Sequence, residues 1–273
     1  MSALEIGTTV DAGGIATNVH IRGDGFPLVM IHGSGPGVSA WANWRLCIGP
    51  LAYGSRVVAP DMVGFGFTER PEGIGYDLDG WVKHLTDLMD ALGIGQADLV
   101  GNSFGGAIAL ALATRFPQRA RRLVLMGSAG LEFPLTPGLD AVWGYEPSVA
   151  AMRGLLDIFA YDRRLVTDEL AEMRYRASIR EGVQEAFSSM FPAPRQRGVK
   201  ALATPEDAIR SLPHRTLIVH GREDRVIPLS SSLRLHELIE NSELHVFGRC
   251  GHWTQIEHAD AFNRLVNDFV SRA

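Results

Sequence analysis

Short apolar runs rich in β-branched residues recur along the chain, and stretches with the spacing of amphipathic helices separate most of them. The runs that predict strands lie at 27–31, 56–59, 97–100, 122–126, 216–220 and 243–246, after two weaker alternating stretches at 4–10 and 16–21. Helical patterns occur at 81–92, 104–116 and 231–240. This alternation predicts an α/β fold with a mostly parallel sheet that is flanked by helices.

The alternation of strands and helices is interrupted between about 132 and 213. Strand-like runs are missing there, prolines are frequent, and helical patterns appear at 148–159, 167–180 and 182–190. Ligands of open α/β folds bind at the carboxyl edge of the sheet, so we interpret the interruption as a helical lid over that edge. The expected organisation is a core of 1–132 and 213–273 with a lid of 133–212. The alternative is an independent helical domain.

Composition narrows the class of protein. The chain has 273 residues, 46% of them hydrophobic, and a formal charge of −5, which argues against a nucleic-acid partner. Two cysteines, Cys47 and Cys250, are too few for a disulfide framework and fit a reducing compartment. The N-terminus lacks a signal-peptide pattern, and no apolar helix is long enough to cross a bilayer. We therefore expect a cytoplasmic protein without a membrane partner.

The strongest chemical signal is a Gly-x-Ser-x-Gly motif at 101–105, between an apolar strand and an Ala/Leu-rich helix. A serine on such a strand-to-helix turn projects its Oγ away from the backbone. This context favours Ser103 as a nucleophile over a purely structural turn.

A serine nucleophile needs a base, and the base needs a carboxylate that orients it. In folds of this type the acid and the histidine follow later strands in that order, and Asp224 and His252 occupy those loops. Glu223 is a weaker candidate for the acid. His220 ends a core strand, so we expect a structural role for it. The predicted triad is Ser103, Asp224 and His252.

An oxyanion hole is expected from two backbone N–H groups. One belongs to Phe104, directly after the nucleophile, and the other to the glycine-rich loop of 31–37, where we select Ser34. His32 is expected to support this loop. The chain has neither a His-Glu-x-x-His pattern nor a Gly-x-Gly-x-x-Gly pattern after a strand, so we expect no metal and no cofactor.

The motifs together resemble the α/β-hydrolase superfamily and, within it, the meta-cleavage product hydrolases, which break carbon–carbon bonds in aromatic catabolism. The resemblance covers nearly the whole chain and rests on His-Gly-Ser-Gly-Pro-Gly at 32–37, Trp-x-Asn-Trp at 41–44, Gly-Asn-Ser-Phe-Gly-Gly at 101–106 and Gly-His-Trp at 251–253. Two further stretches, at 60–66 and 155–162, look like the branch that acts on monoalkylbenzene products.

The resemblance implies a 2-hydroxy-6-oxo-dienoate substrate that is cut at its C5–C6 bond into 2-hydroxypenta-2,4-dienoate and a carboxylic acid. The residues that look like the family's head-group site are Asn43, Asn102, Arg174 and Trp253, beside Gly33 and Gly35 of the oxyanion loop. Arg176 and Arg180 compete with Arg174 for the carboxylate. The candidates for the apolar pocket at the other end of the substrate are Ala129, Phe133, Leu139, Val142, Trp143 and Val226.

Several alternatives stay open at this point. The enzyme could prefer aryl or semialdehyde substrates, or it could be a carboxylesterase with the same triad. A non-enzymatic receptor of this fold would usually have a broken triad. Ser103 could attack the ketone itself or activate water. The resemblance also suggests a homodimer.

Overall fold

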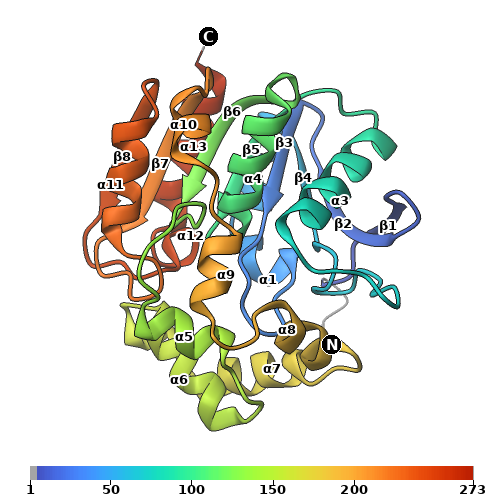
Figure 1. The fold of residues 1–273 in the computed structure, drawn as a ribbon, viewed down its shortest axis with the longest axis vertical. Coiled ribbons are helices and arrows are strands. Elements are labelled where there is room, and N and C mark those ends of the chain that lie inside the picture. The colour runs from blue at the N-terminus through green and yellow to red at the C-terminus, as the bar shows by residue number, and fades with distance from the viewer. Residues whose placement is uncertain (1–4, 273) are drawn as a thin grey trace.

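The computed structural model describes residues 5–272 and contains one sheet of eight strands in the order β1-β2-β4-β3-β5-β6-β7-β8 (Figure 1). β1 and β4 pair antiparallel with β2, and all other neighbouring strands are parallel. The strands are β1 Thr8–Asp11, β2 Ala16–Arg22, β3 Phe26–Ile31, β4 Ser55–Pro60, β5 Ala97–Asn102, β6 Ala120–Met126, β7 Arg215–Gly221 and β8 Ser242–Phe247. The predicted α/β class with a mostly parallel sheet is confirmed.

The two weakly alternating stretches near the start of the sequence, 4–10 and 16–21, were predicted with different accuracy. The second matches β2, but the first was placed too early, because β1 begins only at Thr8. The beginning of that first prediction, at residue 4, lies outside the described residues.

Both faces of the sheet are covered, because successive side chains of a parallel strand point to opposite faces. In β3, Val29 and Ile31 face the core shared with α3 (Leu78–Ala91), α4 (Phe104–Arg115) and α11 (Leu229–Leu238). Leu28 and Met30 face the opposite core, shared with α1 (Ala40–Trp44), α2 (Ile48–Leu51) and α13 (Ala259–Ser271). A short helix, α12 (Thr254–Glu257), precedes α13.

Six helices and a 3₁₀ turn lie between β6 and β7 in the described chain: α5 Pro137–Trp143, α6 Val149–Phe159, η2 Arg163–Leu165, α7 Asp168–Ser178, α8 Val183–Met190, α9 Gln196–Ala201 and α10 Glu206–Arg210. Figure 1 shows α5 to α8 gathered beyond one end of the sheet. This end is the carboxyl edge, because the segment bonds to the loops that follow β7 and β8. Thr136 donates to the Val226 carbonyl at 2.7 Å, and the His252 N–H donates to the Phe159 carbonyl at 2.7 Å.

α10 is arranged differently from the other helices of this segment. It packs against α4 and α11, on the flank of the sheet, rather than over the carboxyl edge. The division into a core and a lid of 133–212 stays a proposal, and the position of α10 argues for an earlier end of the lid.

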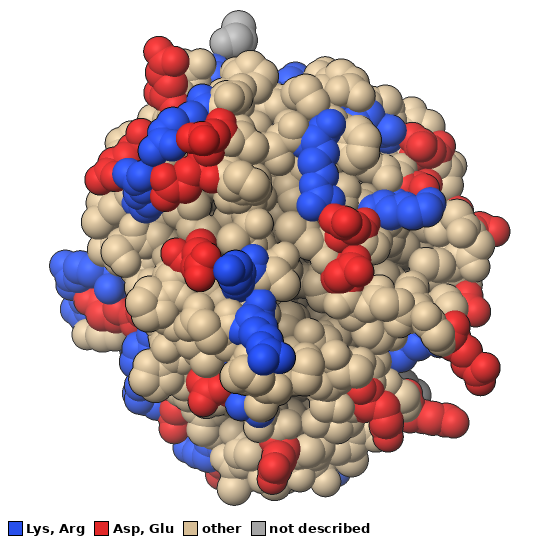
Figure 2. Space-filling view, viewed as in Figure 1, with Lys and Arg blue, Asp and Glu red and all other residues tan. Residues whose placement is uncertain are grey.

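Charged side chains of both signs are interspersed on the face of the molecule shown in Figure 2. Lys and Arg side chains lie next to Asp and Glu rather than in a continuous basic stripe on that face. Within residues 5–272, no helix has the length and apolar character needed to span a membrane.

Candidate active site

Ser103 occupies a tight turn between β5 and α4, and its backbone has φ 54° and ψ −115°. A positive φ is uncommon for a residue other than glycine and marks local strain. Glycines make the turn possible: a Cβ on Gly101 would lie 2.4 Å from the Gly105 carbonyl oxygen, and one on Gly105 would lie 2.2 Å from that of Ile31. The Ser103 N–H donates to the Met126 carbonyl at 2.9 Å, which fixes the turn to β6.

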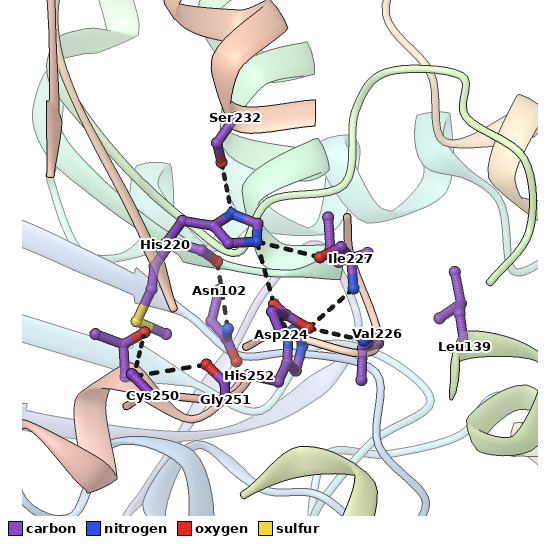
Figure 3. Close-up of polar contacts among 12 residues, drawn as sticks. Asn102, Leu139, His220, Asp224, Val226, Ile227, Ser232, Cys250, Gly251 and His252 are labelled. Carbon is purple, nitrogen blue, oxygen red and sulfur yellow. Dashed lines mark hydrogen bonds and ion pairs between the residues drawn. The ribbon is translucent and has the colours of Figure 1, made fainter. Parts of the chain in front are cut away.

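Asp224 and His252 meet in the loops that follow β7 and β8, as drawn in Figure 3. His252 Nδ1 lies 2.7 Å from Asp224 Oδ2, and the N–H groups of Val226 and Ile227 donate to Asp224 Oδ1 at 2.7 and 3.1 Å. Both side chains are buried. Because an ionised carboxylate accepts only, Nδ1 carries the hydrogen, and Nε2 is left with a lone pair for proton transfer.

The charge state of Asp224 follows from opposing effects. Burial raises the pKa of this carboxyl, but attraction to His252 and His220, hydrogen bonds from His252 and the Val226 N–H lower it, and together they hold it below its ordinary value. Asp224 is therefore ionised at neutral pH. A buried carboxylate that accepts from an imidazole keeps this ring in one tautomer and one orientation.

The loop of 33–37 lies beside Asn102 and Ser103. A Cβ added to Gly33 would be only 3.0 Å from Asn102 Oδ1, so the loop approaches the turn closely. His32 holds the loop as expected: its Nδ1 lies 2.7 Å from the Gly33 carbonyl, and its Nε2 accepts from the Met62 N–H at 2.9 Å. Ser34 Oγ accepts from Trp143 Nε1 at 3.1 Å. The N–H of Phe104 belongs to the first turn of α4, where N–H groups have no partner within the helix.

One pocket of about 750 Å³, including its open mouth, connects these groups. Its lining contains Ser103 and His252 together with most of the predicted binding residues: Gly33, Ser34, Gly35, Asn43, Asn102, Leu139, Val142, Arg174, Val226 and Trp253. Segments that lie far apart in the sequence therefore build one site. Its lining includes both polar side chains and aliphatic side chains from α5 and α6.

Three predicted pocket residues lie behind this lining in the described structure. Trp143 donates to Ser34 Oγ of the site, and it stacks on Phe191 at 4.3 Å between ring centroids. The Ala129 N–H donates to the Ser103 carbonyl at 3.0 Å, and the Phe133 carbonyl accepts from Gln196. These residues support the wall instead of forming it.

The structure separates the three arginines of α7 and the turn after it. Arg174 is half-buried, lines the pocket and donates from Nη2 to the Pro36 carbonyl at 3.3 Å. Burial lowers the pKa of its guanidinium to about 10, so it remains a cation at neutral pH. Arg176 pairs with Glu172 on the exposed face of α7, and Arg180 lies over the Phe67 ring.

The two asparagines differ in how they are held. Asn102 Nδ2 donates to the Met126 carbonyl at 3.4 Å, so this side chain ties the turn to β6 while it also lines the pocket. Asn43 Oδ1 accepts from the Gly33 N–H at 3.4 Å, and its buried Nδ2 has no partner among residues 5–272. An amide donor without a partner is available to an acceptor on a ligand.

The sequence interpretation missed part of the pocket wall. Further lining residues include Met152, Leu156 and Phe159 from α6, Leu170 from α7, and Arg45, Gln255 and Ile256 nearer the core. Phe159 stacks on Trp253 and on His252, at 5.2 and 5.9 Å between ring centroids. The helical pattern at 148–159 was visible in the sequence, but it did not show which of its residues face a ligand.

Among the described residues, no group of three or more His, Cys, Asp or Glu side chains is arranged to hold a metal ion. The two cysteines of the sequence, Cys47 and Cys250, are both free and buried. Burial raises the pKa of the Cys250 thiol to about 12, so it stays protonated at neutral pH.

The chain is similar to known hydrolases in sequence and in structure. The model of the alpha/beta hydrolase fold family matches residues 27–259. The chain is 65% identical to the 2-hydroxymuconate semialdehyde hydrolase of Pseudomonas sp. (strain CF600), over 98% of this chain and 95% of that protein. It is also 65% identical to the 2-hydroxy-6-oxo-2,4-heptadienoate hydrolase of Pseudomonas putida (strain F1), over 98% of this chain and 97% of that protein.

A solved structure gives the same picture. The meta-cleavage product hydrolase CumD of Pseudomonas fluorescens IP01, crystallised as an S103A mutant with acetates, superposes with a TM-score of 0.97. The two proteins share 62% of their sequence over 98% of each chain.

Proposed function

Because this chain belongs to the α/β-hydrolase family and, within it, to the carbon–carbon bond hydrolases of meta-cleavage products, we propose that it cleaves the C5–C6 bond of 2-hydroxy-6-oxo-6-alkylhexa-2,4-dienoates. The products are 2-hydroxypenta-2,4-dienoate and a short carboxylic acid. The observation that carries this proposal is the pocket that Ser103 and His252 line together with the cationic Arg174 and with aliphatic side chains such as Leu139 and Val226.

The polar part of the pocket suits the dienoate head. The guanidinium of Arg174 can grip a carboxylate through two parallel hydrogen bonds, and the free amide of Asn43 can donate to an oxygen of the same head. Substrate binding would replace the bond from Arg174 to the Pro36 carbonyl with an ion pair to the substrate carboxylate. The head is thereby placed so that C6 lies near Ser103.

The proposed reaction has two stages. The dienol first becomes a ketone by moving the proton of its 2-hydroxyl to C5, which prepares the C2 carbonyl to accept electrons. The Ser103 hydroxyl, or a water that it activates, then adds to the C6 ketone while His252 Nε2 takes the proton. The Phe104 and Ser34 N–H groups would stabilise the oxyanion at C6.

Cleavage then follows from the tetrahedral adduct. The C5–C6 electron pair moves into the dienoate as the C6 carbonyl re-forms, and the products leave after net addition of one water. Asp224 would hold His252 in the required tautomer throughout.

A second candidate substrate is 2-hydroxymuconate semialdehyde, which has hydrogen in place of the alkyl group. The relatives named for this substrate, one of them 65% identical, favour it. The pocket favours an alkyl group instead, because Leu139, Val142 and Val226 provide apolar surface that an aldehyde hydrogen would not fill.

The test is spectroscopic. The purified protein is mixed with the yellow 6-methyl, 6-isopropyl and 6-phenyl dienoates, with the semialdehyde and with a simple ester, and the loss of colour or ester is followed. We expect the highest kcat/KM for an alkyl dienoate such as 2-hydroxy-6-oxo-7-methylocta-2,4-dienoate. Ser103→Ala should still bind this compound but hydrolyse it at least roughly a thousandfold more slowly.

Two results would count against the proposal. Efficient ester hydrolysis with untouched dienoates would point to a carboxylesterase. A semialdehyde preference over every alkyl substrate would move the assignment to the second candidate. Ser188→Ala, on an exposed part of α8, serves as the matched serine control and should retain wild-type rates.

A further inference from the structure

A second imidazole lies behind the carboxylate of Asp224, on the side away from His252 (Figure 3). It belongs to His220, the last residue but one of β7, and it is completely buried. His220 Nε2 lies 3.1 Å from the Ile227 carbonyl oxygen and 3.5 Å from Asp224 Oδ2. Both neighbours are acceptors, so Nε2 must carry the hydrogen that faces them.

Ser232 fixes the opposite side of this ring. Its Oγ, on the buried face of α11, lies 2.7 Å from His220 Nδ1. With the hydrogen on Nε2, the neutral ring accepts at Nδ1 from the serine hydroxyl. Burial lowers the pKa of His220 although Asp224 and the Ile227 carbonyl act in the opposite direction, so the ring remains neutral and in one tautomer.

His220, Ile227 and Asp224 form a closed set of contacts. The N–H of Ile227 donates to Asp224 Oδ1, and its carbonyl accepts from His220. Asp224 Oδ1 therefore has two amide donors, while Oδ2 has the His252 Nδ1–H at 2.7 Å and the weaker contact with His220 at 3.5 Å. The carboxylate is held on three sides before any substrate arrives.

We propose that His220 is a positioning residue, whose Nε2–H, set by Ser232, holds the Asp224 carboxylate in the orientation that binds His252. This inference rests on the proposed roles of Asp224 and His252 in hydrolysis. A polar ring at the end of a core strand has a desolvation penalty that an aliphatic side chain would avoid. His220 offsets this penalty with contacts at both ring nitrogens, to Ser232 of α11 on one side and to the Ile227 carbonyl and Asp224 on the other.

The pH dependence follows from the groups around the acid. Asp224 is faced by His252 from the loop after β8 and by His220 from β7, and among the described residues the neutral thiol of Cys250 also interacts with it. The His220 N–H stabilises the charged carboxylate. Without it, the Asp224–His252 pair would take up its first proton at a higher pH, and the acid limb of the kcat/KM profile would shift upward.

The experiment compares four variants with the wild type. His220→Leu removes the donor, His220→Gln replaces it with an amide N–H near the same position, and Ser232→Ala removes the group that sets the tautomer. His84→Gln is the matched control, because His84 is also buried, bonded to Thr17, and packed away from Asp224. The readouts are kcat, the acid limb of kcat/KM against pH, and the downfield proton resonance of His252 Nδ1–H.

We expect kcat of His220→Leu to fall by roughly tenfold or more, which is a part of the 10²–10⁴-fold contribution of general acid–base catalysis. Its acid limb should move to higher pH, Ser232→Ala should shift in the same direction by less, and His220→Gln should recover most of the loss. The His252 Nδ1–H resonance should change in His220→Leu and in Ser232→Ala. His84→Gln should keep the wild-type acid limb and resonance.

The inference is overturned if folded His220→Leu keeps the wild-type acid limb and resonance, or if His84→Gln shifts them as strongly as His220→Leu does. Should His220→Leu fail to fold, Ser232→Ala decides, and a wild-type acid limb and resonance in this variant overturn the inference. The proposed function is judged separately, by wild-type turnover of the dienoates. If only esters are hydrolysed, the same profiles are measured with an ester and still test His220.

Discussion

At the scale of single residues, the site depends on which side chain of several similar ones reaches the pocket. Arg174, Arg176 and Arg180 lie within two helical turns, and a sequence pattern alone cannot select one of them. Which arginine faces the pocket depends on how α7 is rotated relative to the loop of 33–37. The hydrogen bond from Arg174 to the Pro36 carbonyl shows that Arg174 is on the side of this loop. Arg176 bonds to Glu172 on the outer face instead.

This difference predicts the effect of removing each cation. Arg174→Ala should lower kcat/KM for every dienoate acid by roughly 10- to 150-fold, because a hydrogen bond to a charged group is worth about 1.5–3 kcal/mol. The loss should be much smaller for an uncharged ester. Steady-state kinetics on both substrate classes measure it.

Arg176→Ala is the matched control for this prediction. Its exposed ion pair with Glu172 should contribute less than about 1 kcal/mol to the free energy of unfolding. The kcat/KM of Arg176→Ala should therefore remain at the wild-type level. A loss that appears with Arg176→Ala or Arg180→Ala but not with Arg174→Ala would place the carboxylate elsewhere.

At the scale of helices and strands, the sequence predicted the sheet better than the lid. The β-branched runs at 97–100 and 122–126 correspond to β5 and β6, because buried parallel strands are apolar on both faces. α13 was missed, although Phe262, Val266 and Phe269 have helical spacing and pack on the sheet. Loop assignments at strand ends led to Ser103, Asp224 and His252 without a view of the fold.

Pocket walls were harder to predict than strand ends. Leu139 and Leu156 both lie on buried helix faces, and a hydrophobic pattern has the same form whether a side chain meets a ligand or the core. Ala129 and Phe133 show the opposite case, since they are buried behind the wall. The missing information is the three-dimensional packing of α5 and α6 over the carboxyl edge.

α5 should influence the size of the group that the enzyme accepts at C6. Leu139→Ala should raise the ratio of kcat/KM for the 6-phenyl substrate to that for the 6-methyl substrate by roughly tenfold, within the 1–3 kcal/mol typical of hydrophobic pocket changes. The measurement is the two rates on one protein preparation, with folding checked by circular dichroism.

Val149→Ala is the control for this change, because Val149 lies exposed at the start of α6 and should leave the ratio unchanged. An unchanged ratio in folded Leu139→Ala would show that α5 does not bound the C6 side of the pocket.

At the scale of the whole molecule, buried polar groups connect the loops beneath the site. Asp61, after β4, accepts from the N–H groups of Ala40 and Phe67 at 2.5 and 2.8 Å and from Asn18 Nδ2 at 2.8 Å. Close by, His84 Nε2 lies 2.8 Å from Thr17 Oγ1, and its Nδ1 accepts from the Val63 N–H. These bonds link α1, α3 and β2.

His84 predicts how stability depends on pH. Burial lowers its pKa to about 4, while nearby Asp87 raises it and His32 lowers it further. The folded protein keeps this ring neutral, whereas the unfolded chain binds a proton below about pH 6.5, so the free energy of unfolding falls as pH drops between those values. His84 should account for about 2 kcal/mol of the loss between pH 7 and pH 5.

Urea denaturation of wild type and His84→Gln at both pH values checks this expectation. The variant should lose less stability on acidification, whatever its stability at pH 7. His245→Gln removes an exposed histidine and should follow the wild-type slope. An identical slope in all three proteins would contradict the assignment to His84.

The helical segment between β6 and β7 leaves the sheet after Met126, at the carboxyl end of β6, and re-enters it at Arg215, at the amino end of the neighbouring parallel strand β7. The sheet itself therefore fixes the two ends at opposite edges of adjacent strands, and the entropy of closing a loop grows only slowly with its length. We therefore expect this segment to be exchangeable in protein engineering. Chimaeras that take α5 to α9 from another hydrolase should acquire a new substrate range while Ser103, Asp224 and His252, which follow β5, β7 and β8, keep their positions.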